Sequence, residues 1–269
     1  MRKRLFAAAI AAWALAGVAQ AAPRIVSLDQ CADQYVLALA PRSEIVALSK
    51  RATADDSYLK AAAAGLPQGR ATLESILGER ATIAVTNWAG DLRLPAALAR
   101  RGVKVVQIGE ADDYPAVERN VRQVAADLGQ RGGGERLIAR MEAQLAQSRG
   151  AWGGTRALYL TPGGFTAGPG TLVGAMMAAA GLVSAAPAAG YSAVSLEELV
   201  LHPPAALVLG FFSDLAGGRS RWTIAGNGYL QRLNRERAVA SLPGSMLGCP
   251  AWFVADGTLA LAKAHATRH

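Results

Sequence analysis

Short apolar runs alternate with helical segments over the first half of the chain. Four runs have the composition of strands: PRIVSL (23–28), SEIVALS (43–49), ATIAVTN (81–87) and VKVVQIG (103–109). Helical patterns lie between or after them, such as DLRLPAALARRG (91–102), which ends at a glycine as helices commonly do. Strands that alternate with helices over short connections predict a parallel sheet covered by helices.

The pattern changes between residues 131 and 150. The stretch ERLIARMEAQLAQ (135–147) contains no strand, and Leu137, Ile138, Met141 and Leu145 recur in it at helical spacing. Glycine-rich, turn-like stretches flank it on both sides, GQRGGG before and SRGAWGG after. We therefore expect one uninterrupted helix, roughly 20 Å long at 1.5 Å per residue, isolated between two α/β units.

The first pattern restarts after residue 150. Strands are expected at RALYLT (156–161), PAALVLGFF (204–212) and GSMLGC (244–249), and helices at 172–182, 195–202, 226–238 and 256–269. The halves also share a local order of short helix, turn and apolar strand, in TLESILGERATIAVT and in SLEELVLHPPAALVLG. The pattern predicts an α/β fold with two Rossmann-like lobes (22–130 and 151–269), each with a parallel sheet. One long α-helix within 131–150 joins them, and a ligand cleft lies between them.

The first 21 residues have the features of a secretory signal peptide. Arg2, Lys3 and Arg4 precede an uncharged apolar run at 5–18, and Ala19-Gln20-Ala21 offers the small residues of a cleavage site. The apolar run is shorter than the roughly 18 residues of a comfortable membrane span, which disfavours the alternative of a retained anchor helix. We expect cleavage after Ala21 and export of a soluble chain.

The distribution of charge argues against nucleic-acid binding, and the absence of common catalytic motifs argues against several classes of enzyme. The chain carries 28 Lys and Arg against 20 Asp and Glu, a net charge of +8, but no run of five or six cations suggests a nucleic-acid surface. No G-x-S-x-G, P-loop or H-E-x-x-H motif is present. The three histidines are His202, His265 and His269; the last two could share a helical face toward a metal, but a chain end offers them little support. An exported α/β hydrolase is therefore the least favoured alternative.

The order and spacing of four segments resemble a known family. PRIVSLDQCADQYVLAL, TLESILGERATIAVTNW, LARRGVKVVQIG and VSLEELVLHPPAALVL together resemble the periplasmic substrate-binding proteins of ABC importers for vitamin B12, ferric siderophores and haem. This is the group with a single helical backbone between the lobes. The family's usual KPDLV segment reads ERATIAV here, which keeps the strand but lacks the Lys-Pro.

The resemblance implies a function without catalysis. The protein would be periplasmic and monomeric, with no intrinsic cofactor, and would bind an iron-siderophore or a cobalamin-type corrinoid between its lobes. It would deliver this chelate to an ABC permease dimer with ATPase subunits. The resemblance also implies that Glu74 and Glu197, with Glu198 as a close alternative, dock on the permease. First-turn glutamates favoured by the helix dipole are the ordinary explanation of such residues.

The loops that follow the strands predict the cleft lining. The candidates are Asp29, Gln30, Cys31, Tyr58, Asn87, Trp88, Phe165, Phe212, Arg221, Trp222, Cys249 and Trp252. Aromatic rings with a few arginines suit a large flat ligand with peripheral anionic groups, such as a corrinoid, a haem or a ferric chelate. Packing is the alternative for each aromatic residue, and we favour it for Trp152 and Trp252.

Cys31 and Cys249 are expected to face the same cleft from opposite lobes. A disulfide between them would need Cα atoms within about 7 Å and would lock the lobes, which conflicts with admitting a large ligand. We therefore favour two cleft-facing thiols, reversibly paired or able to touch a metal. A protein that binds haem, or a free metal ion through Cys31 and Cys249, is the alternative function.

Overall fold

A computed structural model describes residues 22–88, 91–211 and 227–267. The N-terminal lobe contains a five-stranded parallel sheet in the order β3-β2-β1-β4-β5. Its strands are β1 (Ile25–Ser27), β2 (Ile45–Ser49), β3 (Gln68–Gly69), β4 (Ile83–Thr86) and β5 (Lys104–Gln107). The two-residue β3 has no counterpart among the predicted strands; the other four are confirmed.

Helices cover both faces of this sheet because its strands carry apolar side chains on both sides. Ile25 and Val85 pack toward α1 (Gln30–Leu39) and α5 (Tyr114–Asp127). Val26 and Ala84 pack on the other face, toward α3 (Leu73–Gly78) and α4 (Leu94–Ala99). Two short helical segments, η1 (Arg42–Glu44) and α2 (Lys60–Ala63), lie in the connections.

The C-terminal lobe repeats the arrangement with one strand fewer. Its parallel sheet has the order β11-β10-β6-β8, formed by β6 (Arg156–Leu160), β8 (Val183–Ser184), β10 (Ala206–Gly210) and β11 (Ala238–Leu242). A separate antiparallel ribbon consists of β7 (Phe165–Ala167) and β9 (Tyr191–Ala193). One face of the sheet packs on α7 (Leu172–Ala179) and α11 (Val254–Ala266), and the other on α8 (Leu196–Leu201) and α9 (Gly228–Arg237).

The strand predicted at 244–249 is wrong. The last strand, β11, lies earlier, at Ala238–Leu242, and Gly244–Leu247 forms the short helix α10. Pro243 separates them and lacks the N–H that a strand would donate, while its carbonyl accepts a turn hydrogen bond from the N–H of Met246 (3.0 Å).

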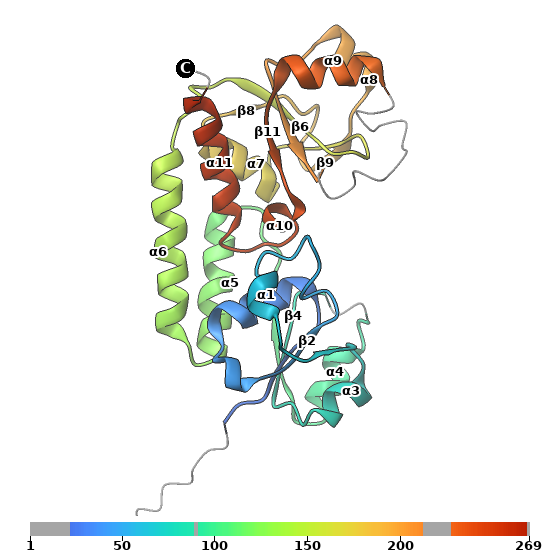
Figure 1. Cartoon of the computed structure of the whole chain (residues 1–269), viewed down its shortest axis with the longest axis vertical. Coiled ribbons are helices and arrows are strands. Elements are labelled where there is room, and N and C mark those ends of the chain that lie inside the picture. Colours follow the sequence, from blue (N-terminus) through green and yellow to red (C-terminus); the bar gives the residue numbers. More distant parts are fainter. Residues whose placement is uncertain (1–21, 89–90, 212–226, 268–269) are drawn as a thin grey trace, which may run out of the picture.

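The helix α6 (Arg131–Ser148) joins the lobes along one side of the molecule (Figure 1). Its 18 residues span about 27 Å, longer than predicted, because Gly132 to Gly134 form its first turn instead of a loop. A Cβ on Gly134 would lie 2.6 Å from the Cβ of Ala125 in α5, so this glycine lets the two helices approach closely. One buried apolar cluster runs from the N-terminal lobe through α6 to α7 and α11, so the lobes share a core. Within the described residues, no helix has the length and apolarity to cross a membrane.

Candidate ligand-binding cleft

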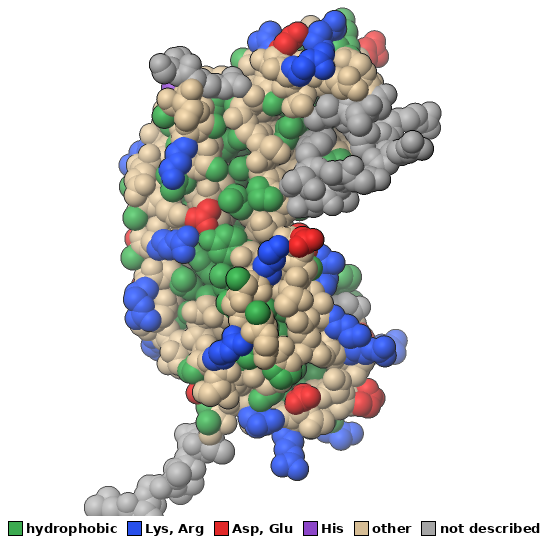
Figure 2. Space-filling view, viewed as in Figure 1, with side chains coloured by type: hydrophobic (Ala, Val, Ile, Leu, Met, Phe, Trp, Pro, Cys, Tyr) green, Lys and Arg blue, Asp and Glu red, His purple; other side chains and the backbone are tan. Residues whose placement is uncertain are grey.

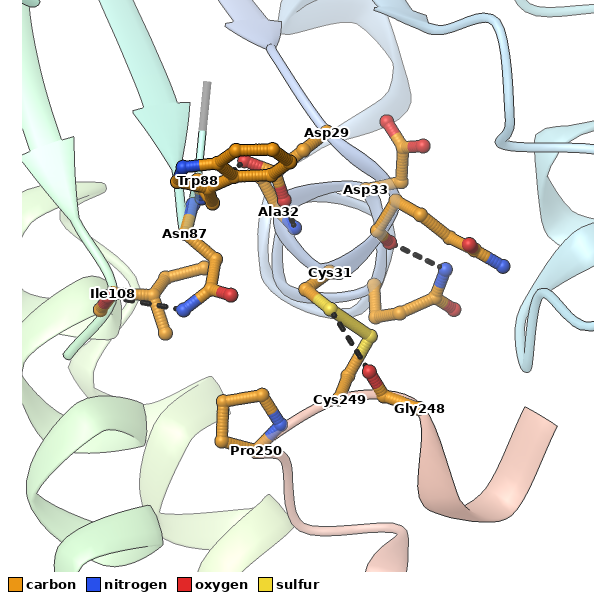
Figure 3. The surroundings of a disulfide bond; sticks show 12 residues. Asp29, Cys31, Ala32, Asp33, Asn87, Trp88, Ile108, Gly248, Cys249 and Pro250 are labelled. Atoms are coloured by element: carbon orange, nitrogen blue, oxygen red, sulfur yellow. Dashed lines mark hydrogen bonds between the residues drawn. A yellow bond between two sulfur atoms is a disulfide. The ribbon is translucent and has the colours of Figure 1, made fainter. Parts of the chain in front are cut away.

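The floor of the cleft is built around Asp29, which follows β1. One carboxylate oxygen caps α1 by accepting from the N–H of Ala32 (2.9 Å). The other accepts from the Thr86 hydroxyl (2.9 Å) and from the N–H groups of Asn87 (2.7 Å) and Trp88 (2.9 Å), which follow β4. The direction of strand order reverses between β1 and β4, and ligands of open parallel sheets bind outside such a reversal. Asp29 therefore fixes the loops at this point of the sheet (Figure 3).

Trp88 presents a large apolar surface at this reversal. Its side chain is 70% exposed while its backbone is held by Asp29. The neighbouring Asn87 points toward β5, where its amide donates to the Ile108 carbonyl (3.2 Å; Figure 3). Of these two candidates, Trp88 has the surface available to a flat ligand.

A cavity of about 400 Å³ lies beside Trp88, at the carboxyl ends of β1, β2 and β3. Gln30 lines it and is fixed by two partners, since its amide donates to Asp56 (2.9 Å) and its carbonyl accepts from Arg51 (2.8 Å). Lys50 and Arg70 also line it. The sequence pattern did not indicate either residue, because single cations after strands have the same pattern as ordinary surface charges.

The expectation of two free thiols is wrong. Cys31 and Cys249 form a disulfide, with Cα atoms 5.3 Å apart (Figure 3). The disulfide does not block ligand entry, because it lies where the two lobes meet, and Cys249 is part of the apolar core that they share. On the side away from α6 the molecule is hollowed between the lobes (Figure 2).

The segment after the disulfide packs on the N-terminal lobe. The Tyr35 hydroxyl donates to the Pro250 carbonyl (2.6 Å), and the Tyr35 ring meets Trp252 edge-on at 5.4 Å. Trp252 is 2% exposed. Its side chain is therefore part of the core and does not face the cleft, in line with the packing alternative.

Tyr58 also lies in the contact between the lobes. Its ring stacks on Phe253 at 4.1 Å, and its hydroxyl donates to Asp256 in α11. Arg140 of α6 reaches the same carboxylate (3.3 Å). Burial, together with the nearby Asp256, raises the pKa of the Tyr58 phenol. The contacts give Tyr58 a role in joining the lobes.

The C-terminal wall contains an aromatic pair on the β7–β9 ribbon. Phe165 is opposite Ala193 and Tyr191 is opposite Ala167, so both rings lie on one face of the ribbon, 54% and 68% exposed. Burial and the carboxylates of Asp112 and Glu110 raise the pKa of Tyr191. The sequence pattern did not indicate Tyr191, because a three-residue strand gives no clear alternation of apolar and polar positions.

Other parts of this wall are only partly described. The candidates Phe212, Arg221 and Trp222 lie outside the described residues. Phe211, which follows β10, has a left-handed backbone (φ 63°), a conformation uncommon for a bulky residue. A further cavity of about 500 Å³ lies between the lobes, lined by Asp112 and Asp113 on one side and by residues around Gly170 on the other.

Glu74 and Glu197 occupy corresponding positions in the two lobes. Glu74 follows Thr72, whose hydroxyl caps α3, and Glu197 follows Ser195, whose hydroxyl caps α8. Both glutamates are exposed, and their helices lie on the side of the molecule away from α6 (Figure 1). Glu198 instead approaches His202 (3.2 Å).

Of the two C-terminal histidines, the structure describes only His265. His265 packs its ring against Trp152 (4.7 Å), and His269 lies outside the described residues. Within residues 22–88, 91–211 and 227–267, no group of three or more His, Cys, Asp or Glu side chains is placed to hold a metal. A cavity of about 740 Å³ flanks the starts of β6 and β10, at the amino-terminal end of the C-terminal sheet.

Solved structures with the same architecture are periplasmic binding proteins. The haem-binding protein RhuT from Roseiflexus sp. RS-1 is 26% identical, with a TM-score of 0.66 over 91% of this chain and 99% of that chain. A periplasmic haem-binding protein from Pseudomonas aeruginosa is 24% identical, with a TM-score of 0.66 over 90% and 91%. The vitamin B12-binding protein BtuF of Vibrio cholerae is 18% identical, with a TM-score of 0.60 over 91% and 96%.

No protein-family model and no curated protein matches the sequence. The similarity to these solved structures extends over about nine-tenths of the chain, which includes both lobes and α6. The chain thus has the fold of the periplasmic binding proteins for haem, vitamin B12 and ferric hydroxamate.

Proposed function

We propose that this protein is the periplasmic ligand-binding component of an ABC importer. It captures a metal chelate, an iron-siderophore, a cobalamin-type corrinoid or a haem, in the cleft between its lobes and delivers it to a membrane permease. One observation carries the proposal: the carboxyl ends of two parallel sheets face each other across a cleft, with the exposed Trp88 at the strand reversal of one sheet. The similarity to binding proteins for haem, vitamin B12 and ferric hydroxamate supports it.

A titration tests this proposal. The mature chain is titrated with haemin, cyanocobalamin and a ferric trihydroxamate, and tryptophan emission and visible absorbance are recorded. We expect at least one chelate to bind at a 1:1 ratio and to quench the emission, because Trp88 lies at the expected site. Trp88→Phe should lower the quench, whereas Trp152→Phe, in the core, should leave the affinity unchanged. Absence of binding by all three chelates would contradict the proposal.

The disulfide removes one alternative function. A metal ion held by Cys31 and Cys249 requires thiolates, and both sulfurs are engaged in the bond. Haem remains within the proposed class, since it is a metal chelate with peripheral carboxylates. The proposal includes no turnover of the bound ligand.

We extend the proposal to the membrane partner. The chain is exported, cleaved after Ala21, and docks on an ABC permease dimer with ATPase subunits through Glu74 and Glu197. One acidic side chain on each lobe suits a partner with two-fold symmetry, because complementary charges set the orientation of an encounter.

Substitution of the two glutamates tests this docking. Glu74→Ala and Glu197→Ala should leave chelate affinity unchanged and lower the stimulation of the transporter's ATPase by about tenfold when combined. Glu142→Ala, an exposed substitution on α6, serves as the control and should change neither quantity. A loss of chelate affinity in the Glu74 or Glu197 variants would show that these residues line the ligand site instead.

A further inference from the structure

The charges along the cleft floor are divided between its two ends. The loops after β2 and β3, at one edge of the N-terminal sheet, carry Lys50, Arg51 and Arg70. The loop after β5, at the opposite edge, carries the exposed Glu110 and Asp112. Trp88 follows β4 and lies between the two groups. The strand order alone therefore gives the floor a basic end and an acidic end.

The cations at the basic end are available to a ligand. Arg51 is paired with Asp56 (2.5 Å), and the exposed Asp55 of the same loop is paired with Lys60 (3.1 Å). Lys50 and Arg70 are exposed, and neither forms an ion pair with any residue that the structure describes. Both line the 400 Å³ cavity beside Trp88.

Asp29 is the one carboxylate among the described residues that line this cavity, and it does not pair with Lys50 or Arg70. Asp29 accepts four hydrogen bonds from Ala32, Thr86, Asn87 and Trp88, so both of its oxygens are directed into the protein. The cavity thus combines an aromatic surface with uncompensated positive charge.

We propose that the cleft selects flat metal chelates whose negative charges lie on one edge, and that Lys50 and Arg70 recognise that edge while Trp88 contacts the apolar face. This inference rests on the proposed function and narrows its substrate class to anionic chelates. The carboxylates of Glu110 and Asp112 add to the selection, because they disfavour a ligand turned with its anionic edge toward β5.

Charge reversal at the basic end tests the inference. Haemin carries two carboxylates on one edge, and its dimethyl ester has the same ring without these charges. We expect wild-type protein to bind haemin at least about tenfold more tightly than the ester, with an affinity for haemin that falls as salt rises. Lys50→Glu and Arg70→Glu should each weaken haemin binding by about tenfold and leave binding of the ester unchanged.

A matched variant separates local from general charge effects. Arg101→Glu changes the net charge by the same amount. Arg101 lies on the turn before β5, at the amino-terminal end of the sheet, whereas the cleft lies at the carboxyl end. The substitution should alter haemin affinity by less than about twofold. Near-ultraviolet circular dichroism and melting temperature establish that all three variants keep the fold.

The outcomes distinguish this inference from the proposed function. Binding of cyanocobalamin or the ferric trihydroxamate, with haemin bound no more tightly than its ester, would overturn the charge selection and leave the importer function in place. Haemin affinity unaffected by both charge reversals would also overturn it. Failure of every chelate to bind would contradict the proposed function itself, and this inference with it.

Discussion

At the scale of single residues, Asp33 is the most deeply buried carboxyl of the N-terminal lobe. It is fully buried and accepts hydrogen bonds from the Ser27 hydroxyl at the end of β1, and from the hydroxyl (2.6 Å) and N–H (2.8 Å) of Ser49 at the end of β2. Burial raises the pKa of Asp33, the three hydrogen bonds oppose this, and the charge of nearby Asp29 adds to the rise. The side chain thus ties α1 to the strand ends that form the cleft floor.

The raised pKa of Asp33 determines whether its contribution to the free energy of unfolding rises or falls with pH. A carboxyl whose pKa is higher in the folded state stabilises the fold fully below its unfolded pKa, and loses this contribution as pH rises through the folded pKa. Asn cannot ionise, so Asp33→Asn should gain stability relative to wild type as pH rises from about 4 toward 7. Urea unfolding at several pH values measures this difference.

A control for this prediction is Asp55→Asn, because the Asp55 side chain is fully exposed. The difference in unfolding free energy between Asp55→Asn and wild type should not rise in favour of the variant between about pH 4 and pH 7. A difference for Asp33→Asn that stays constant with pH, or that favours wild type as pH rises, would show that burial does not raise the pKa of this carboxyl.

At the scale of secondary-structure elements, the predicted strands are those that lie within apolar runs. β1, β2, β4, β6 and β10 are buried at nearly every position because helices cover both of their faces. β5 was also predicted, although it is an edge strand whose Lys104 and Gln107 are exposed. β3 and β8 have two residues each, which is too short for a pattern. The ribbon β7–β9 was hidden within a glycine-rich loop for the same reason.

The start of α6 shows how packing can outweigh local propensity. Three consecutive glycines favour a turn, yet Gly132 to Gly134 are helical. Gly134 is buried against Ala125 and Val121 of α5, where any side chain would collide. The free energy of this close packing is a property of two helices together, so a pattern read along one of them does not reveal it.

Some features of the candidate site follow from the local sequence, and others depend on contacts between segments that are distant in the sequence. Loop position after a strand was enough to name Asp29, Gln30 and Trp88 as candidates, and their contact with a ligand stays a prediction. Lys50 and Arg70 emerged only when strand order placed their loops beside Trp88. The pairing of Cys31 with Cys249 depends on a distance between residues 218 apart in sequence, which no sequence pattern supplies.

At the scale of the whole molecule, covalent and non-covalent contacts both join the lobes at the base of the cleft. Besides the disulfide, Tyr35 bonds to Pro250, Tyr58 to Asp256 and Tyr114 to Thr258, so three N-terminal phenols contact the segment that begins α11. These contacts continue into the shared core along α6. We therefore expect the lobes to remain together without the disulfide.

Replacement of both cysteines by serine tests this expectation. The double variant Cys31→Ser, Cys249→Ser should unfold with a free energy lower by about 2–5 kcal/mol, because the crosslink closes a very long loop of the unfolded chain. Its radius of gyration, measured by small-angle X-ray scattering, should equal that of wild type. Alkylation of unfolded wild-type protein should modify neither cysteine before reduction and both afterwards.

Two results would distinguish the role of the disulfide from that of the non-covalent contacts. A larger radius of gyration in the double variant would mean that the disulfide, and not the phenol contacts and the core, holds the lobes together. Alkylation before reduction would instead show that the cysteines are unpaired. If the radius is unchanged while chelate affinity is also retained, the cleft admits its ligand with little movement of the lobes, as a single helical connection and a continuous core would require.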